Sequence, residues 1–84
     1  MQSIINQRSK IEWTPYLATG VAEGFETANN FDETVEAWAY LIKTGLVWKL
    51  QGWFGRSAQD IIEGGSIDKE GTINWDVIDE SLEQ

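Results

Sequence analysis

Apolar residues recur at the spacing of an α-helix in the first half of this chain. Pro15 suits the first turn of a helix, and apolar side chains after it share one face. Asn30 starts a capping-box pattern in front of a second periodic stretch, and Gly45 has the position of a glycine that ends a helix. These patterns predict helices over residues 14–28 and 32–44.

A longer periodic stretch follows. From Leu46 to Ile62 the apolar residues are spaced by three or four positions, with polar or small residues between them. This spacing predicts one amphipathic helix over residues 46–63. Gly52 and Gly55 both disfavour helix, so the sequence leaves open whether the helix is continuous through them.

The two ends of the chain lack the helical period. Residues 1–13 show no clean pattern and are expected to form a loosely held arm. Residues 66–74 alternate around Gly71, which predicts a small β-hairpin, and residues 75–82 predict a short helix. The expected fold is mainly α: one small three-helix domain with a short C-terminal β-hairpin and a short final helix, because a chain of 84 residues has room for one domain.

The composition excludes several kinds of chemistry. The chain has neither cysteine nor histidine, so disulfides, thiolate nucleophiles and histidine bases are absent. Residues 66–77 resemble a calcium loop, but Ser66 and Val77 stand where that motif needs carboxylates, which favours a plain turn. We therefore expect no metal site, no cofactor, no catalytic residue and no enzymatic activity.

The hydropathy of the chain indicates a soluble protein. No apolar run reaches the ~18–20 residues that a membrane span needs. The polar N-terminus lacks the apolar segment of a signal peptide. The expected location is therefore the cytoplasm, without membrane association.

Charge is divided unevenly along the sequence. The formal net charge is -8, and nearly all of it comes from the last third. This third is predicted to form an acidic surface that either attracts basic partners or serves only solubility. Its members are Asp60, Glu63, Asp68, Glu70, Asp76, Asp79, Glu80 and Glu83.

By contrast, no acid occurs from Ala37 to Gln59, where aromatic and basic residues gather. This segment is either core or a binding surface. Its basic and aromatic residues off the main apolar stripe are candidates for contact with a protein partner, because Trp and Arg are enriched at binding hot spots. They are Tyr40, Lys43, Trp48, Lys49, Gly52 and Arg56. Three positive charges neutralise few phosphates, so direct binding of nucleic acid is not expected.

The segment from Trp38 to Arg56 reads Trp-x-Tyr-Leu-Ile-x-Thr-Gly-Leu-x-Trp-x-Leu-Gln-Gly-Trp-Phe-Gly-Arg. It resembles a family of short bacteriophage-encoded proteins of unknown function, and the resemblance covers residues 36–65. It implies a phage or mobile-element origin and action inside the bacterial cytoplasm. It implies no activity and no catalytic residue.

Three functional hypotheses follow. The first is a small acidic phage accessory protein that binds and modulates a host or phage protein without enzymatic activity. The second is an acidic mimic of nucleic acid that inhibits a host nucleic-acid-binding protein, such as a defence protein. The third is a small structural protein that assembles with copies of itself, as a homo-oligomer.

Overall fold

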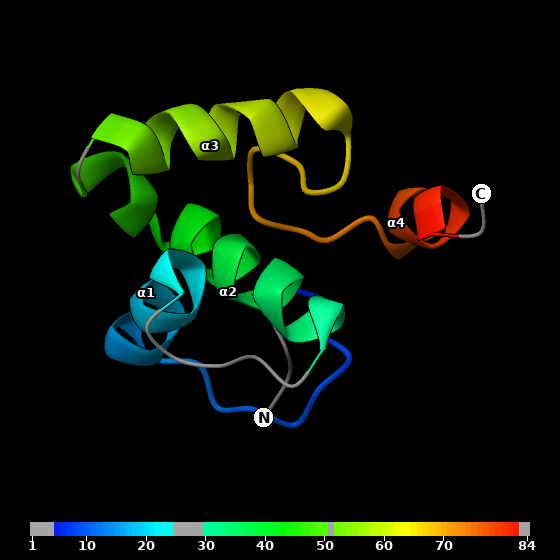
Figure 1. Ribbon diagram of the computed structural model, residues 1–84, viewed down its shortest axis with the longest axis horizontal. Helices are drawn as coiled ribbons and strands as arrows, with labels where there is room; N and C mark the ends of the chain where they lie inside the picture. Colours follow the sequence, from blue (N-terminus) through cyan, green and yellow to red (C-terminus); the bar gives the residue numbers. More distant parts are fainter. Residues whose placement is uncertain (1–4, 25–29, 51, 83–84) are drawn as a thin grey trace.

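Helix α2, Phe31–Thr44, is the central element, and the other elements are arranged around it (Figure 1). The computed structural model describes residues 5–24, 30–50 and 52–82. The other elements are helix α1 at Pro15–Glu23, the 3₁₀ helix η1 at Leu46–Lys49, helix α3 at Gly52–Gly64 and helix α4 at Trp75–Leu82. Within the described ranges, no helix has the length and apolar character required to cross a bilayer.

Local signals set both ends of α2. The side chain of Asn30 accepts a hydrogen bond from the backbone nitrogen of Glu33 at 3.1 Å, which caps the first turn. Gly45 has φ 79°, a left-handed conformation that ends the helix. Between them, residues 35–39 are all buried. Because five consecutive positions point to every side of a helix, the middle of α2 is covered on all sides.

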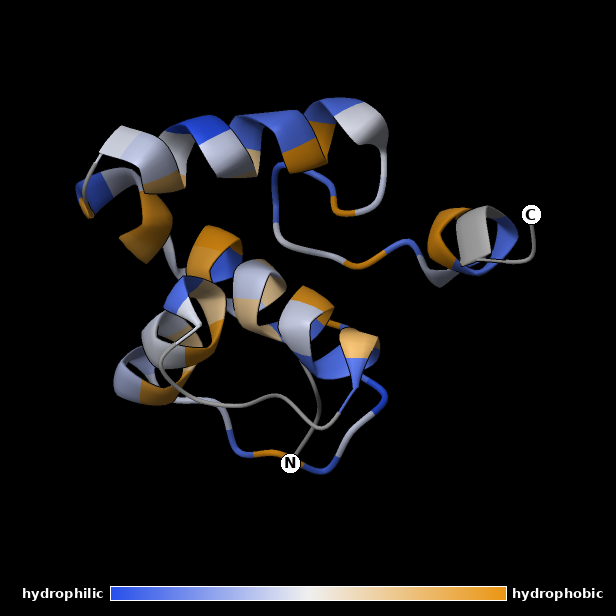
Figure 2. Cartoon of the chain, viewed as in Figure 1, coloured by the Kyte–Doolittle hydropathy of each residue, from blue (hydrophilic) through white to orange (hydrophobic). Residues whose placement is uncertain are grey.

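The core lies between α2 and its neighbours. In Figure 1, α1 and α3 lie on different sides of α2, while α4 stands at the far end of the molecule. Figure 2 shows apolar positions of α3 on the side that faces α2, in agreement with the burial of Phe54 and Ala58. Trp38 of α2 contacts Phe54, with ring centroids 5.8 Å apart. These contacts fix α3 and η1 against the central helix.

Helix α1 is shorter than the predicted 14–28. Thr14 and Pro15 do form its start, since the Thr14 hydroxyl accepts a hydrogen bond from the backbone nitrogen of Leu17 at 3.1 Å. The helix ends at Glu23 because Gly24 adopts φ 89°, where its backbone nitrogen bonds to carbonyls of the last turn. The rest of the predicted range, 25–28, lies outside the described residues.

The predicted single helix over residues 46–63 is divided in two. Leu50 is extended, with φ -86° and ψ -175°, and this separates η1 from α3. The break therefore precedes both Gly52 and Gly55: α3 begins at Gly52 and is continuous through Gly55. Packing explains the position of the break, because the extended Leu50 places its side chain against the core cluster.

The prediction of a C-terminal β-hairpin is wrong: the described residues contain no strand. Ile67 and Ile73 are buried and form one isolated antiparallel bridge. The bridge does not extend because the carboxylate of Asp68 accepts hydrogen bonds from the backbone nitrogens of Glu70 and Thr72, at 2.9 and 3.0 Å. The side chain thus holds a compact turn where ladder pairing would otherwise continue. The fold is small and helical.

The N-terminal segment also differs from the loose arm expected for residues 1–13. In its described part, residues 5–13, Ile5 is fully buried. The carboxylate of Glu36, 0 % exposed, accepts hydrogen bonds from the backbone nitrogens of Arg8 and Ser9 at 2.8 and 2.9 Å. It also accepts bonds from the Ser9 hydroxyl and, at 3.1 Å, from the indole nitrogen of Trp13. These bonds satisfy the buried acid and fasten the segment to α2.

Candidate functional site

Trp48 is the most exposed tryptophan of the described residues, with 49 % of its surface open. It lies in η1, which begins directly after the left-handed Gly45. A Cβ atom built on Gly55 would lie 3.7 Å from Cε3 of Trp48, so the indole rests on the first turns of α3. One edge of the ring lies over Gly55 at van der Waals distance, while the exposed half of the ring faces outward.

Gly52 of α3 is covered by the side chain of Arg56. A Cβ atom on Gly52 would lie 3.4 Å from Nη1 of Arg56, so the guanidinium folds back over the start of the helix. Arg56 and Lys49 are both exposed. The indole of Trp48 and the guanidinium of Arg56 therefore lie over the two glycines, and exposed Lys49 follows Trp48 in η1. The name Trp48 surface is used below for five residues of η1 and α3: Trp48, Lys49, Gly52, Trp53 and Arg56.

Trp53 connects this surface to the core. Its ring stacks on buried Phe54 with centroids 4.1 Å apart, and it meets Trp38 edge-on at 6.1 Å. It nevertheless keeps 38 % of its surface exposed. The helical period places Trp53 on the inner stripe, so its exposure could not be predicted from the sequence. Its aromatic contacts hold the start of α3 in place beneath the exposed groups.

Two of the six residues predicted to contact a protein partner, Tyr40 and Lys43, lie on α2, outside the Trp48 surface. Tyr40 is half-buried and packs against the core cluster, and its carbonyl accepts a hydrogen bond from the Thr44 hydroxyl at 3.0 Å. Lys43 is exposed, but a Cβ on Gly71 would lie 2.6 Å from Cβ of Lys43. The lysine therefore stands beside the turn that contains Asp68. The four exposed residues of η1 and α3 remain the coherent part of the predicted patch.

The predicted acidic residues are distributed over α3, the following turn and α4. Asp79 is partly exposed and Glu83 lies outside the described residues. The remaining members are exposed, namely Asp60 and Glu63 on α3, Asp68 and Glu70 in the turn, and Asp76 and Glu80 on α4. Across the described part of the chain, no three acids converge in a way that would hold a metal ion.

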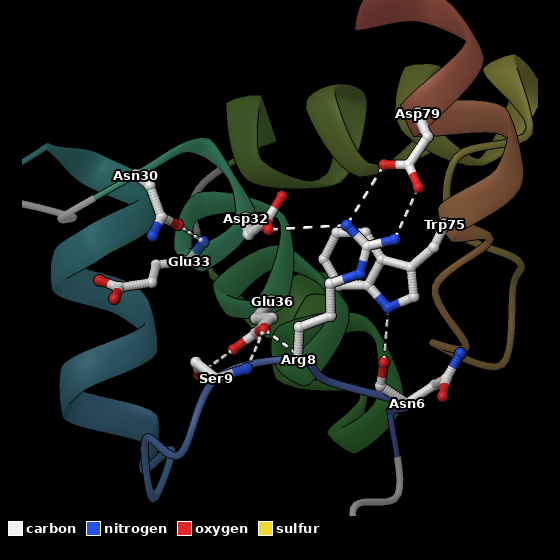
Figure 3. Close-up of polar contacts among 9 residues, drawn as sticks. All are labelled: Asn6, Arg8, Ser9, Asn30, Asp32, Glu33, Glu36, Trp75 and Asp79. Atoms are coloured by element: carbon white, nitrogen blue, oxygen red, sulfur yellow. Dashed lines mark hydrogen bonds and ion pairs between the residues drawn. The ribbon is translucent and has the colours of Figure 1, made fainter.

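Arg8 forms a polar cluster that no pattern in the sequence predicts (Figure 3). Its guanidinium lies 4.1 Å from the ring centroid of Trp75 and makes two hydrogen bonds to Asp79, at 3.2 and 2.7 Å. It also lies 3.7 Å from Asp32 at the start of α2. The indole nitrogen of Trp75 donates to the carbonyl of Asn6 at 2.6 Å. One side chain of the N-terminal segment thus connects α2 with α4.

The ion pair between Arg8 and Asp79 shifts the pKa of both groups. The hydrogen bond from Arg8 lowers the pKa of the Asp79 carboxyl below its ordinary value, and partial desolvation opposes this. The bond to Asp79 raises the pKa of Arg8 in turn. Both groups are open to solvent, so the pair sets geometry more than it stabilises the fold. The cluster holds α4 in position and leaves the Trp48 surface free.

Comparison with known proteins identifies the family. The chain belongs to the family described as a domain of unknown function (DUF7417), whose model matches residues 24–82. The match contains α2, η1, α3 and α4, and therefore the whole Trp48 surface, whereas Arg8 precedes it. No curated protein and no solved structure matches the chain.

Proposed function

We propose that this chain is a small non-enzymatic accessory protein that binds another protein through the Trp48 surface and modulates it. The observation that carries the proposal is the half-exposed indole of Trp48, supported from below by Gly55 and lying beside the exposed cations Lys49 and Arg56. An exposed indole next to a guanidinium is the composition typical of binding hot spots. The proposal that the protein lacks enzymatic activity rests on the absence of cysteine and histidine from the sequence.

The biological setting of the proposal comes from the sequence. The resemblance of residues 36–65 to short phage-encoded proteins supports a phage origin, a host or phage protein as partner, and action in the bacterial cytoplasm. The Trp48 surface lies within this segment. The same residues thus carry both the resemblance and the exposed aromatic group.

Affinity capture from a bacterial host lysate, at low and at high salt, tests the proposal. The tagged protein is compared with the double variant Trp48→Ala/Arg56→Ala. Tyr16→Ala is the matched control, because Tyr16 is an aromatic residue of α1 that is 81 % exposed. We expect a partner that the wild-type protein and Tyr16→Ala retain and that the double variant loses. A partner retained equally by all three, with circular dichroism showing intact folds, would contradict the proposal.

The acidic surface supports a second candidate function, mimicry of nucleic acid. Its exposed carboxylates, on the last turns of α3, in the turn and on α4, are the supporting observation. A partner bound there would be a basic nucleic-acid-binding protein of the host, released by high salt and displaced by DNA. Charge reversal of Asp76 and Glu80 to Lys would abolish such binding, while Trp48→Ala would leave it unchanged. Capture that depends on Trp48 instead excludes this function for that partner.

A further inference from the structure

Positive and negative side chains are concentrated at opposite ends of the longest axis of the molecule. In Figure 1 this axis is horizontal, with η1 at one end and α4 at the other. The acid-free segment supplies Lys49 and Arg56 at the η1 end, whereas Asp76 and Glu80 are exposed on α4. The extent along this axis is 32 Å. The Debye length at physiological ionic strength is only about 8 Å. The Trp48 surface is therefore screened from the acids of α4, and the charged groups that belong to it, Lys49 and Arg56, are both positive.

Helix α3 limits the size of this positive region. Asp60 and Glu63 follow Arg56 by four and seven positions, so all three lie near one line along the helix. With a rise of 1.5 Å per residue, the first of these exposed acids comes about 6 Å beyond Arg56. An anionic ligand that extends further along α3 meets repulsion. The cations therefore accept only a short acidic stretch, placed over η1 and the first turn of α3.

From this geometry we propose that the Trp48 surface binds a short acidic segment of the partner protein, with a few carboxylates beside one aromatic or aliphatic side chain. The carboxylates pair with Lys49 and Arg56, and the apolar side chain packs on the exposed part of the Trp48 indole. This inference rests on the proposed function and adds the chemical class of the ligand. Charge complementarity at the η1 end is the observation behind it.

A polynucleotide suits the surface less well. Its phosphates are spaced along an extended strand, so a strand lying on Lys49 and Arg56 continues toward Asp60 and Glu63. The acidic surface of a second copy is spread over α3, the turn and α4, without an exposed large apolar side chain among its described acids for the Trp48 ring. At the start of α2, however, exposed Phe31 stands next to Asp32 in the sequence, so a second copy is a competing occupant that dilution of the protein alone distinguishes. A short acidic segment with an apolar side chain pairs with the two cations without reaching Asp60 and Glu63, and it also fills the exposed part of the Trp48 ring.

The test uses the full chain labelled with ¹⁵N at its five tryptophans, each of which gives one indole N–H resonance. The probe is the synthetic peptide Gly-Ser-Glu-Asp-Phe-Asp-Glu-Ser-Gly. Its matched control replaces each acid by the corresponding amide. Trp13 and Trp75 serve as internal references, because their indole N–H groups are engaged with Glu36 and with Asn6 inside the fold.

We expect the acidic peptide to shift the resonances of Trp48 and Trp53 and to leave those of Trp13 and Trp75 in place. The amide peptide should bind roughly tenfold more weakly or worse, and the variant Lys49→Gln/Arg56→Gln should lose the preference for the acidic peptide. Equal binding of the two peptides, or no shift of Trp48 by the acidic peptide, would overturn the inference. So would a stronger response to a single-stranded oligonucleotide, or shifts of Trp48 on diluting the protein alone, which would identify a second copy as the occupant.

Failure of this inference can be told apart from failure of the proposed function. Carbodiimide cross-linking of the captured complex joins Lys49 to a partner carboxylate only where the two are in contact. A partner that depends on Trp48 but cross-links through no acidic segment refutes the acidic ligand and leaves the docking role intact. A lysate that yields no partner dependent on Trp48 refutes the docking role itself.

Discussion

The buried carboxylate of Glu36 accepts a hydrogen bond from the backbone nitrogen of Arg8 at 2.8 Å, across 28 positions of sequence. The acid thus recognises the main chain of the N-terminal segment and leaves the Arg8 side chain free to reach Trp75 and Asp79. The carboxylate anchors the backbone, and the guanidinium then positions α4. In Figure 3 both interactions start from the same short stretch of chain.

Replacing Glu36 by Gln should destabilise the protein strongly although the shape is conserved. Both carboxylate oxygens act as acceptors for two hydrogen bonds each, and the amide nitrogen of Gln would face donors instead. We expect a loss of about 2–4 kcal/mol in the free energy of unfolding, measured by urea denaturation. Glu12→Gln, at an exposed position, is the control and should stay close to wild type. Equal stability of the two variants would show that Glu36 does not anchor the segment.

The ion pair of Arg8 and Asp79 should affect stability at acid pH. The pKa of Asp79 is lowered in the folded state from its ordinary value of 3.8, so its contribution is present above that pH and is lost as the pH falls through the folded value. Between neutral pH and about pH 3, wild type should therefore lose more stability than Asp79→Asn does. Glu80→Gln, one position further, should follow the wild-type profile. Parallel profiles for wild type and Asp79→Asn in thermal melts would contradict this linkage.

Two glycine substitutions should act in opposite directions. Gly55→Ala places a Cβ at an ordinary contact distance from Trp48 in a helix interior, so we expect up to about 1 kcal/mol of stabilisation from helix propensity. Gly71→Ala should cost about 2 kcal/mol or more, because Gly71 has φ 90° and the new Cβ would lie 2.7 Å from the backbone of Lys43. Urea denaturation of both variants checks the signs. A neutral effect of Gly71→Ala would mean that the turn can move away from α2.

The exposed and the buried aromatic residues of this region should separate binding from stability. Trp48→Ala removes a half-exposed ring and should lower the free energy of unfolding by about 1 kcal/mol or less, while weakening partner binding. Phe54→Ala removes a buried ring that contacts Trp38 and should cost about 3–5 kcal/mol. Calorimetric melting of the two variants gives the comparison. Severe unfolding of Trp48→Ala would assign Trp48 to the core and remove the basis of the docking surface.

The amino-acid sequence by itself determined the features of this protein that depend on near neighbours. Thr14 caps α1, Asn30 caps α2, and Gly45 ends α2, because a capping side chain or a left-handed glycine acts within a few residues of its own position. The exposure of Trp48 and Arg56 was also predictable, since the helical period placed both away from the main apolar stripe, whereas the same period placed the exposed Trp53 on it. The sequence likewise fixed the absence of cysteine and histidine chemistry.

Only the tertiary structure decided how distant residues meet. Periodicity cannot show that Glu36 receives the backbone of Arg8, because that bond joins segments with no common pattern. It also cannot place the break at Leu50, where a core contact outweighs helix continuity, or limit the pairing of Ile67 with Ile73 to one bridge, where the Asp68 side chain takes the neighbouring N–H groups. In each case a long-range contact or a side-chain hydrogen bond overrode a local preference of smaller free energy.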